Sequence, residues 1–561
     1  MNKPTLFAFA LLLAGGTVAA QPAKSAGGKV KPKSQAAVTI STPAAPAPLD
    51  WSLTYAASIT PEALRQDLEV LASDAYEGRK TGEKGQKMAA DYLANAFAAA
   101  GLTGPMTGAA NPYLQQFTLN RVALDAAATT LQLGGKTYRG NADFHAILNA
   151  AFERPQLLQP AFVGYGIVDE KYADFVANTQ EYKGKDLVLL MGEPLNAKGE
   201  PLLGTDGKPS PYAALDLKGI GARQRHLMPL GARSITFILP SAEAFATVPA
   251  NFKRALGREE IEFDGKASDE HGFNGLLVSP ELGARMLGTT VAGLDKYRKA
   301  VAKAGKPLAS PFTPAAATLR AVRNKVPFTT ENVLGYLEGS DKKEELIVVS
   351  AHYDHLGMKD GKVMNGADDD GSGTVSVLAM ARAFSQAKKD GHGPRRSLLF
   401  LANTGEEAGL LGSQYYTENP VFPLANTVTN LNIDMIGRVD EEHAGKGDYL
   451  YLVGADKLSS ELHALSEATN QQYNPLALDY KYNDPNDPER IYYRSDHYNF
   501  AKNGIPVIFY TSGDHDDYHK STDDVDKIDF PAMARRDHLI FHTAWALAQR
   551  ETRVAVDSNK P

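Results

Sequence analysis

Three consecutive aspartates, Asp368 to Asp370, stand in the segment NGADDDGSG between residues 365 and 373. Adjacent carboxylates repel one another, so a folded chain rarely packs three in a row without a counter-charge. A solvated acidic turn or a helix N-cap would be alternatives, since an apolar helical pattern begins a few residues later. A divalent cation would supply the counter-charge if other ligands lie nearby.

Further acidic and imidazole side chains occur in polar segments that each follow an apolar run. They are His352 and Asp354 after ELIVVSA, Glu406 and Glu407 after SLLFLANTG, Asp434 after VTNLNI, and DHDDYHKSTDD (residues 514–524) after IPVIFY. Oxygen and imidazole ligands without cysteine are typical of a catalytic site for zinc, or for manganese or cobalt in similar geometry. So many carboxylates exceed the needs of one zinc, which indicates two ions bridged by a carboxylate.

The elements that position these residues are predicted from the alternation of apolar runs after about Pro314. EELIVVSAHYD, RRSLLFLANTG, VTNLNIDMIG and GIPVIFYTSG are strand-like, whereas GTVSVLAMARAFSQA and GLLGSQYYTEN are helix-like. Near-continuous apolar strands that alternate with helices predict an α/β fold, with a mixed, mostly parallel sheet flanked by helices. Ligands of such sheets bind beyond the carboxyl ends of the strands, where the polar segments are predicted to lie.

Six segments, in this order, resemble the signature segments of the co-catalytic zinc exopeptidases, which include secreted bacterial leucyl aminopeptidases and glutamate carboxypeptidase II. They are AHYDHLG, NGADDDGSG, NTGEEAGLLGS, NLNIDMIGR, YRSDHYNF and YHKSTDD. The resemblance covers about Lys325 to Arg550 and the earlier segment LASDAYEGRKTGEKGQKMAADYLANAF. The stretch from FVGYGI to YKGKDLVLLMGEP resembles the protease-associated domain that is often inserted in such enzymes.

The resemblance implies a two-zinc centre with five protein ligands. His352 and Asp434 would bind one ion, Glu407 and His519 would bind the second, and Asp369 would bridge the two. Manganese or cobalt could substitute for zinc in such a site.

The resemblance also implies three residues that assist catalysis. Glu406 would be the general base, and Asp354 would orient the imidazole of His352, which lies two residues away on the same face of an extended chain. Tyr492 would help to stabilise the oxyanion, with the adjacent Tyr493 as the alternative.

Other residues near the same segments have less definite roles. His515 is an alternative to His519, since it lies four residues away in the same acidic loop. The resemblance gives no ligand role to His355 or His497, so we expect both to be hydrogen-bonded supports. Arg438 would bind a substrate carboxylate or form an ion pair that fixes the loop after Asp434.

The first 49 residues are predicted to lie outside the fold. Lys3, an apolar run from Leu6 to Leu13 and small residues ending at Ala20 predict a signal peptide over residues 1–20. Residues 21–49 are rich in Ala, Pro and Lys and predict a flexible linker. The apolar run is too short to span a bilayer, so we expect an exported protein, periplasmic or secreted, with no membrane span.

The remaining length and composition predict a globular protein of more than one domain. A chain of 561 residues exceeds one ordinary core, and we predict a catalytic domain in two segments, 50–155 and 305–552. A β-rich protease-associated insert would occupy residues 156–304, and residues 553–561 would form a C-terminal tail. The net charge of −7 and the lack of a Lys/Arg block exclude a typical nucleic-acid-binding protein. The chain has no cysteine, so it relies on its buried core instead of disulfides.

These observations predict an exported di-zinc metallo-exopeptidase with a peptide substrate, and an aminopeptidase is favoured. A glutamate-carboxypeptidase-like dipeptidase or carboxypeptidase would share the metal ligands. A single-zinc glutaminyl cyclase and a non-catalytic receptor-like scaffold are further alternatives, although the full set of ligands and the base is present. Serine hydrolase chemistry is unsupported because no G-x-S-x-G segment occurs.

Overall fold

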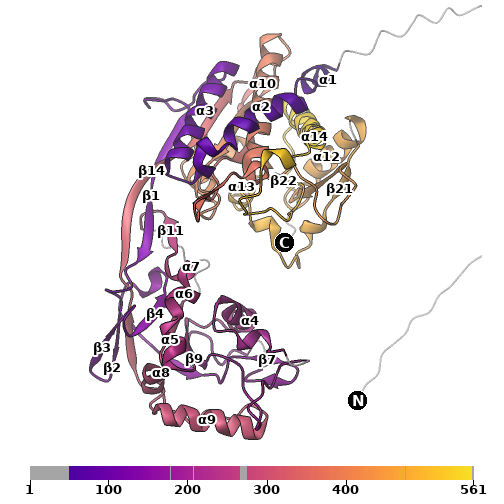
Figure 1. The fold of residues 1–561 in the computed structure, drawn as a ribbon. Coiled ribbons are helices and arrows are strands. Elements are labelled where there is room, and N and C mark those ends of the chain that lie inside the picture. Colours follow the sequence, from indigo (N-terminus) through magenta and orange to yellow (C-terminus); the bar gives the residue numbers. More distant parts are fainter. Residues whose placement is uncertain (1–49, 177–178, 206–207, 266–273, 474, 559–561) are drawn as a thin grey trace, which may run out of the picture. The chain divides into compact units, whose positions relative to one another are not determined.

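The computed structural model describes residues 50–558, except for 177–178, 206–207, 266–273 and 474 (Figure 1). The predicted signal peptide and linker lie outside the described residues. Within the described part of the chain, no helix combines the length and the apolar content that crossing a bilayer would require.

A nine-stranded mixed sheet carries the polar segments. Its strand order is β11–β1–β14–β18–β15–β19–β22–β20–β21. The four neighbouring strands β18 (Arg396–Asn403), β15 (Lys342–His352), β19 (Thr427–Ile433) and β22 (Val507–Thr511) are parallel. Their carboxyl ends therefore lie at one edge of the sheet.

The outer strands of this sheet are β11 (Glu259–Glu262), β1 (Leu114–Leu124), β14 (Arg323–Leu337), β20 (Tyr449–Val453) and β21 (Ala477–Asp479). They pair antiparallel to their neighbours, apart from β20 with β21. The α/β fold with a mixed sheet flanked by helices is confirmed. Parallel pairing is confined to the central strands and the β20–β21 pair.

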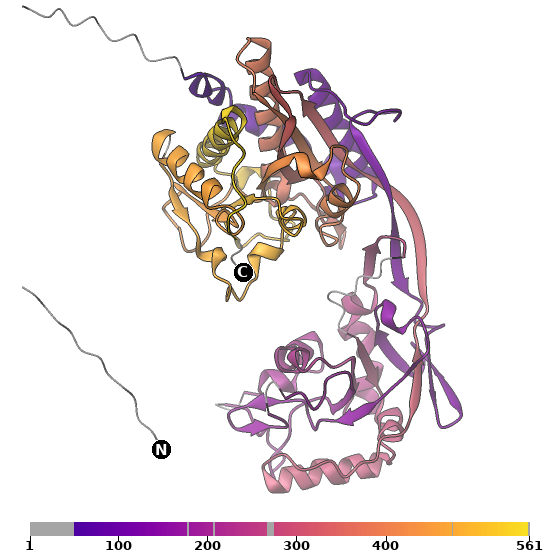
Figure 2. The same cartoon turned by 180° about the vertical axis from the view of Figure 1, so that it is seen from behind.

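Helices cover both faces of the sheet, because its central strands are apolar on both sides (Figures 1 and 2). Ile347 and Val349 of β15 face one core, while Leu346 and Val348 face the other. The first core includes residues of α1 (Trp51–Ala56), α2 (Pro61–Leu71), α3 (Lys84–Ala100), α10 (Gly373–Lys389), α12 (Ser460–Tyr473) and α14 (Phe530–Gln549). The second includes residues of α11 (Leu411–Glu418) and α13 (His497–Ala501).

The long helices have clear start and stop signals in the sequence. Pro61 opens α2, and the side chain of Thr60 accepts a hydrogen bond from the backbone of Ala63. Helix α3 ends at Gly101, whose φ of 88° is the left-handed conformation that glycine adopts without strain. These helices pack against α10, which begins directly after the aspartate run.

A second group of elements lies between β1 and β14 in the chain. Its five-stranded sheet has the order β4–β12–β10–β9–β6, in which all neighbours are parallel except β4 and β12. The strands are β4 (Phe144–Ile147), β6 (Pro160–Phe162), β9 (Asp186–Leu190), β10 (Ser234–Ile238) and β12 (Gly275–Val278). A smaller sheet contains β2 (Thr130–Leu133), β3 (Lys136–Arg139), β5 (Gln156–Leu157) and β13 (Ala317–Arg320).

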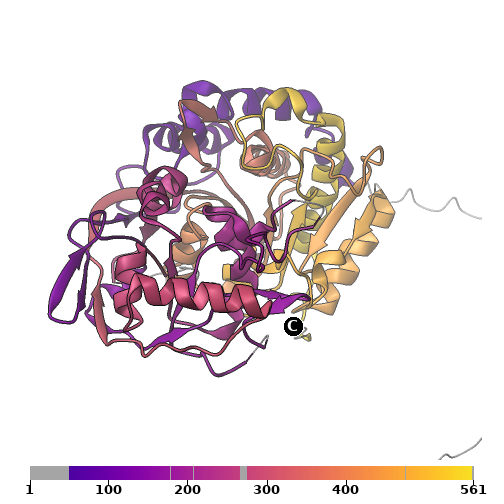
Figure 3. The ribbon, with the colours of Figure 1, turned by 60° about the horizontal axis from the view of Figure 1, so that its bottom comes forward.

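This group also contains helices, the longest of which are α4 (Leu217–Leu227) and α9 (Val291–Ala304), the latter seen along its length in Figure 3. Several strand pairs join residues inside the predicted insert to residues outside it. β4 and β13 lie outside residues 156–304 but pair with β12 and β5, respectively, whereas β11 lies inside this range but pairs with β1. The division of the chain into domains is still a prediction. The assignment of residues 156–304 to a protease-associated domain is also a prediction.

The described part of the predicted C-terminal tail, residues 553–558, contacts the fold at three residues. Arg553 donates hydrogen bonds to the carbonyls of Ala425 and Thr427, and Val554 is buried in the first core. Asp557 accepts hydrogen bonds from Ser460. Arg553, Val554 and Asp557 therefore attach this segment to the fold, whereas Val556 is exposed.

Candidate metal centre

Four of the five residues predicted to bind metal lie at or after the carboxyl end of a parallel strand. His352 ends β15, Asp434 directly follows β19, and Glu407 follows β18. Asp369 lies in the turn that precedes α10, and His519 lies in the loop after β22. Because these strands are parallel and adjacent, residues from distant parts of the chain meet at one edge of the sheet.

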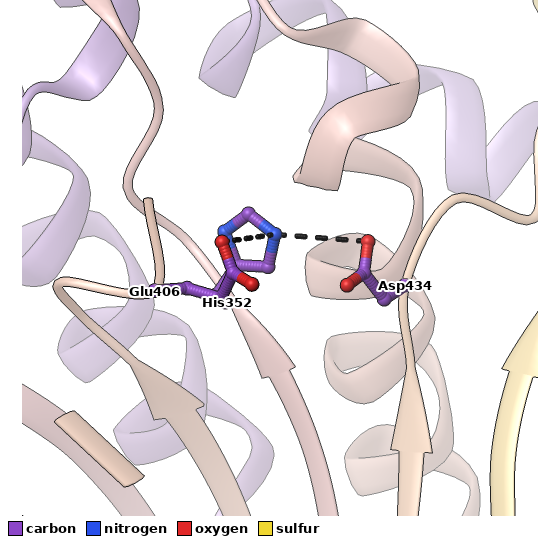
Figure 4. Close-up of side chains that lie close together, drawn as sticks. All are labelled: His352, Glu406 and Asp434. Carbon is purple, nitrogen blue, oxygen red and sulfur yellow. Dashed lines mark ion pairs between the residues drawn. The ribbon is translucent and has the colours of Figure 1, made fainter. Parts of the chain in front are cut away.

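A first cluster of donor atoms surrounds the imidazole of His352. Its Nε2 lies 3.3 Å from Asp369 Oδ1, 3.6 Å from Asp434 Oδ1 and 3.8 Å from Glu406 Oε2. Figure 4 shows the carboxylates of Glu406 and Asp434 on different sides of this ring. Nδ1 of His352 lies 3.1 Å from the carbonyl oxygen of Asp354, which can only accept a hydrogen bond. Nδ1 therefore carries a proton, which leaves Nε2 as the ring nitrogen that could bind a metal ion beside the carboxylates.

A second cluster of donor atoms surrounds Glu407. His519 Nε2 lies 3.2 Å from Glu407 Oε2 and 3.1 Å from Asp369 Oδ2. His355 Nδ1 lies 2.8 Å from Glu407 Oε1 and 3.7 Å from Asp369 Oδ2. Asp369 thus presents one oxygen to each cluster. The structure brings all five predicted ligands together, with Glu406 beside the first cluster and His355 inside the second.

The donor atoms fit metal ions in distance and in chemistry. Two ligands about 2.1 Å from a tetrahedral zinc lie about 3.4 Å apart, which is close to the separations in both clusters. Asp369 Oδ2, Glu407 Oε1 and His355 Nδ1 are buried and have no hydrogen-bond partner among the described residues. Leaving such atoms unpaired costs free energy, so a cation that binds all of them would be strongly favoured.

The other two aspartates of the run bind backbone amides. Asp370 accepts hydrogen bonds from the amides of His352, Gly373 and Met435, at 3.2, 2.8 and 3.2 Å. Asp368 accepts one from the amide of Gly437 at 2.6 Å. These bonds join the ends of β15 and β19 to the start of α10, and Asp369 alone of the three lies between the two clusters.

A buried arginine supplies a fixed positive charge next to the aspartate run. Arg79 is 1% exposed and donates to the carbonyls of Leu71, Tyr353, Asn365 and Gly366. Burial lowers the pKa of Arg79, while the charges of Asp369 and Asp523 oppose that change. Sequence reasoning did not single out Arg79, because an arginine in the segment YEGRK gives no sign of burial.

Asp354 and Ser495 position other groups of the centre. The Asp354 carboxylate accepts a hydrogen bond from Thr81 Oγ1 at 2.7 Å and from the amide of Glu406 at 3.2 Å. Oδ1 of Asp354 is 3.7 Å from Nδ1 of His352, whereas the carbonyl oxygen of Asp354 is 3.1 Å away. The carbonyl is therefore the nearer of the two oxygens. Ser495 Oγ donates to Asp434 Oδ2 at 2.6 Å and leaves Oδ1 facing His352.

The electrostatics of the clusters separate the two adjacent glutamates. Burial raises the pKa of Glu406 well above its usual value, and the charges of Glu407 and Asp434 act in the same direction. Burial also opposes the charge on Glu407, but the His355 and His519 rings hold the pKa of Glu407 below its usual range. Glu406 is therefore the carboxyl group suited to hold a proton, and Glu407 the one suited to stay charged.

A cavity of about 470 Å³ opens onto the first cluster. It is lined by His352, Asp369, Glu406 and Asp434 and by Met435, Tyr482, Ile491, Arg494, Phe509, Thr511, Gly513, Asp514 and Tyr518. Tyr492 does not line it: its ring lies under Lys457 Nζ, at 4.8 Å from the ring centroid, and against Gly454. Tyr518 and Tyr482, and not the predicted Tyr492, are the tyrosines beside the centre.

The remaining residues near the motifs have structural partners. His515 Nε2 lies 3.2 Å from Asp368 Oδ2 and is not next to Glu407, so His519 is the histidine of this loop that reaches the second cluster. Arg438 forms an ion pair with Asp517 at 3.1 Å, which ties the loop after β19 to the loop after β22. His497 is fully buried and stacks on Phe509.

Two clusters of histidine and carboxylate that share one aspartate, at the carboxyl edge of an α/β sheet, define a candidate two-ion metal centre. Residues 332–544 match the model of Peptidase family M28.

Curated proteins similar to this chain include a metalloprotease and an aminopeptidase by name. A "Probable zinc metalloprotease" of Pyrenophora tritici-repentis (strain Pt-1C-BFP) is 26% identical over 281 residues, 41% of this chain and 54% of that protein. "Aminopeptidase YwaD" of Bacillus subtilis (strain 168) is 26% identical over 212 residues, 36% of this chain and 42% of that protein. The chain thus spans about half the length of the curated relatives that it matches.

Similar solved structures include an aminopeptidase from Aneurinibacillus sp. strain AM-1, with a TM-score of 0.48 and 16% identity over 90% of this chain and 98% of that one. The zinc aminopeptidase BSAP from Bacillus subtilis gives a TM-score of 0.46 and 18% identity over 89% and 98% of the two chains.

Proposed function

We propose that the chain is a zinc-dependent exopeptidase that removes amino-terminal residues from peptides. The observation that carries this proposal is the shared aspartate: Asp369 presents one oxygen to each of two donor clusters, and Glu406 lies beside the first. The match to Peptidase family M28 supports the same conclusion. On the N-terminal sequence we also propose export from the cytoplasm.

The residues of each cluster would hold one zinc ion. His352 and Asp434 would bind the first, Glu407 and His519 would bind the second, and Asp369 would bind both. When bound, two zinc ions polarise a scissile carbonyl and lower the pKa of a water molecule beside it.

Glu406 is the group in this centre that moves a proton. Its carboxylate would take a proton from the attacking water at Oε2 and pass it to the nitrogen of the leaving amine. A carboxyl group whose pKa is raised by burial is suited to both steps, because it accepts a proton readily near neutral pH. The hydrogen bond from its amide to Asp354 holds the segment in place at its main chain and leaves the side chain free for this transfer.

Tyr518 is the residue that we propose to stabilise the developing oxyanion. It lines the cavity, and burial together with the charges of Asp369 and Glu406 raises the pKa of its phenol. The phenol therefore stays protonated and can donate a hydrogen bond. Arg494 Nη2 lies 3.4 Å from its oxygen, which brings a positive charge close to the same point.

The charges along the cavity favour a substrate with a free amino group. Asp514 lines the cavity outside both clusters, so it is a carboxylate that zinc would not use. Burial raises the pKa of Asp514; the charges of Arg494 and His515 oppose this change, and those of Asp369 and Asp434 add to it. An ammonium group bound between Asp514 and the centre would relieve this repulsion.

A second candidate, a dipeptidase or carboxypeptidase, is favoured by one observation. Arg494 is the one Lys or Arg side chain among the described residues that line the cavity, and its nearest carboxylate, Glu489, is 4.0 Å away. An arginine so placed could bind the terminal carboxylate of a short peptide.

A panel of substrates separates these candidates. We expect hydrolysis of aminoacyl anilides and of peptides with a free amino terminus, and no hydrolysis of their N-acetylated forms. Preference for dipeptides or N-acyl-glutamates would favour the second candidate. A chelator should abolish all activity, and zinc should restore it. Activity that survives complete removal of metal would refute the proposal, and one zinc per chain with cyclisation of N-terminal glutamine would identify a glutaminyl cyclase.

A further inference from the structure

His355 lies inside the second donor cluster, although the motifs give it no ligand role. It stands in the loop directly after β15, and its side chain is 0% exposed. Its Nδ1 is 2.8 Å from Glu407 Oε1 and 3.7 Å from Asp369 Oδ2. His519 approaches the same two carboxylates through Glu407 Oε2 and Asp369 Oδ2. Two imidazoles therefore converge on one pair of acids.

The contact between His355 and Glu407 is short but does not have the geometry of a hydrogen bond. Nδ1 of His355 and Oε1 of Glu407 are 2.8 Å apart, yet neither atom has a hydrogen-bond partner among the described residues. Oδ2 of Asp369 is likewise buried and has no hydrogen-bond partner among the described residues. One donor atom from each of His355, Asp369 and Glu407 lies within 4.8 Å of the other two. A cation between these atoms would satisfy all three.

The absence of a side chain at Gly366 leaves space for the imidazole of His355. Gly366 has a φ of +54°, and a Cβ on it would lie 2.5 Å from Cγ and Cδ2 of His355 and 2.2 Å from the carbonyl oxygen of Asp369. A larger residue at position 366 would displace the imidazole or the aspartate. The amide of His355 donates to the carbonyl of the buried Arg79, which fixes the main chain on the other side.

We propose that His355 is a further ligand, through Nδ1, of the ion held by Asp369, Glu407 and His519. This inference rests on the two-ion centre of the proposed function. The second ion then has two imidazoles and two carboxylates, which fill a tetrahedral zinc site. The first ion has His352, Asp434 and the shared Asp369, and it keeps an open position beside Glu406 for substrate. The two ions therefore differ in role: the second is held tightly, and the first exchanges and meets the substrate.

A cysteine at this position gives a direct optical test, because the chain has no cysteine of its own. His355→Cys, loaded with two equivalents of Co²⁺, should show a sulfur-to-cobalt charge-transfer band in the near ultraviolet. The matched control is His497→Cys, which replaces a fully buried histidine that stacks on Phe509 and forms no ion pair with a carboxylate of either cluster. The control should show no such band. Absence of the band in folded, cobalt-loaded His355→Cys would overturn the proposal.

Zinc binding provides the second measurement. In His355→Gln we expect affinity for the more tightly bound equivalent to fall by about 100-fold or more, since loss of a group that only orients a ligand already costs about 10- to 100-fold. His497→Gln should stay within about threefold of the native protein. Retention of both ions by His355→Gln, with affinities within threefold of native, would overturn the proposal.

The native protein decides the question if these variants do not fold. X-ray absorption of the zinc-loaded chain should report three imidazoles shared between two ions, and two imidazoles would exclude His355. That result would leave the proposed function intact. Failure of the native chain to bind zinc would instead refute the proposed function, and this inference with it.

Discussion

Replacing Glu406 by glutamine separates proton transfer from metal binding. Glu406 Oε2 lies 3.8 Å from His352 Nε2, beside the first cluster, so distance alone allows it to be a base or a ligand. Glutamine has the same shape, and the hydrogen bond to Asp354 uses the main-chain amide, which the substitution keeps. The fold around the side chain should therefore be unchanged.

A positioned general base contributes about 10²- to 10⁴-fold to the rate, or about 3 to 5 kcal/mol of barrier. We expect Glu406→Gln to lose kcat by that factor while KM changes little and both zinc ions remain. The assay is steady-state hydrolysis of an aminoacyl anilide at saturating zinc, together with the zinc content of the same sample.

The adjacent Glu407→Gln is the matched control, since it changes the same chemical group one residue away. Its carboxylate lies between His355 and His519, so we expect it to lose the second ion as well as activity. If Glu406→Gln lost an ion, Glu406 would be a ligand and not the base. If it kept both ions and more than a tenth of the native kcat, the proton-transfer role would be refuted.

Three further predictions test the surroundings of the centre. Ser495→Ala removes the hydrogen bond that orients Asp434, and zinc affinity or kcat should fall about 10- to 100-fold; unchanged values in a zinc titration would contradict this. The carboxylates of Asp369 and Glu407 outweigh burial and raise the pKa of His519 to about 10 in the metal-free protein, so zinc must displace a proton. The stability that protonated His519 provides is complete below the ordinary histidine pKa, near 6.5, and is lost as the pH rises through about 10. Zinc affinity should therefore rise with pH over that range, with proton release measurable by calorimetry in buffers of different ionisation enthalpy, and a pH-independent affinity would count against it. Arg79→Ala leaves buried carbonyls without their donor and should lower the free energy of unfolding by about 3 kcal/mol or more in urea, whereas a change below about 1 kcal/mol would mean that water replaces the arginine.

The sequence was sufficient to predict the strands that carry the centre, because buried parallel strands are short apolar runs and polar residues begin where they end. β18, for example, lies within RRSLLFLANTG, and Glu406 and Glu407 follow it directly. The antiparallel partners of the central strands were harder to predict. β1 and β14 pair over eleven residues, from Leu114 with Val333 to Leu124 with Arg323, although most of the second group of elements separates them in the chain.

Individual roles depend on contacts that no local pattern encodes. The three aspartates are alike in sequence, and they differ in the fold because Asp370 and Asp368 accept backbone amides from other segments. Tyr492 was predicted to lie beside the centre from its place before the segment SDH, but its ring packs against Gly454. Tyr518 reaches the cavity because the loop after β22, whose path the sequence does not reveal, carries it there.

The negative charge of the four carboxylates favours the binding of more than one divalent ion at this centre. The two clusters contain four carboxylates, on Asp369, Glu406, Glu407 and Asp434, and all four are at most 12% exposed at the side chain. One divalent ion would leave two of these charges to be neutralised by protons, on groups such as Glu406 and His519 whose pKa is raised. Two ions balance all four, and the raised pKa of Glu406 then marks it as the group that gives up its charge when the centre takes a proton. The same balance accounts for the aspartate run: Asp368 and Asp370 accept backbone amides, and Asp369 would be shared between the two proposed cations.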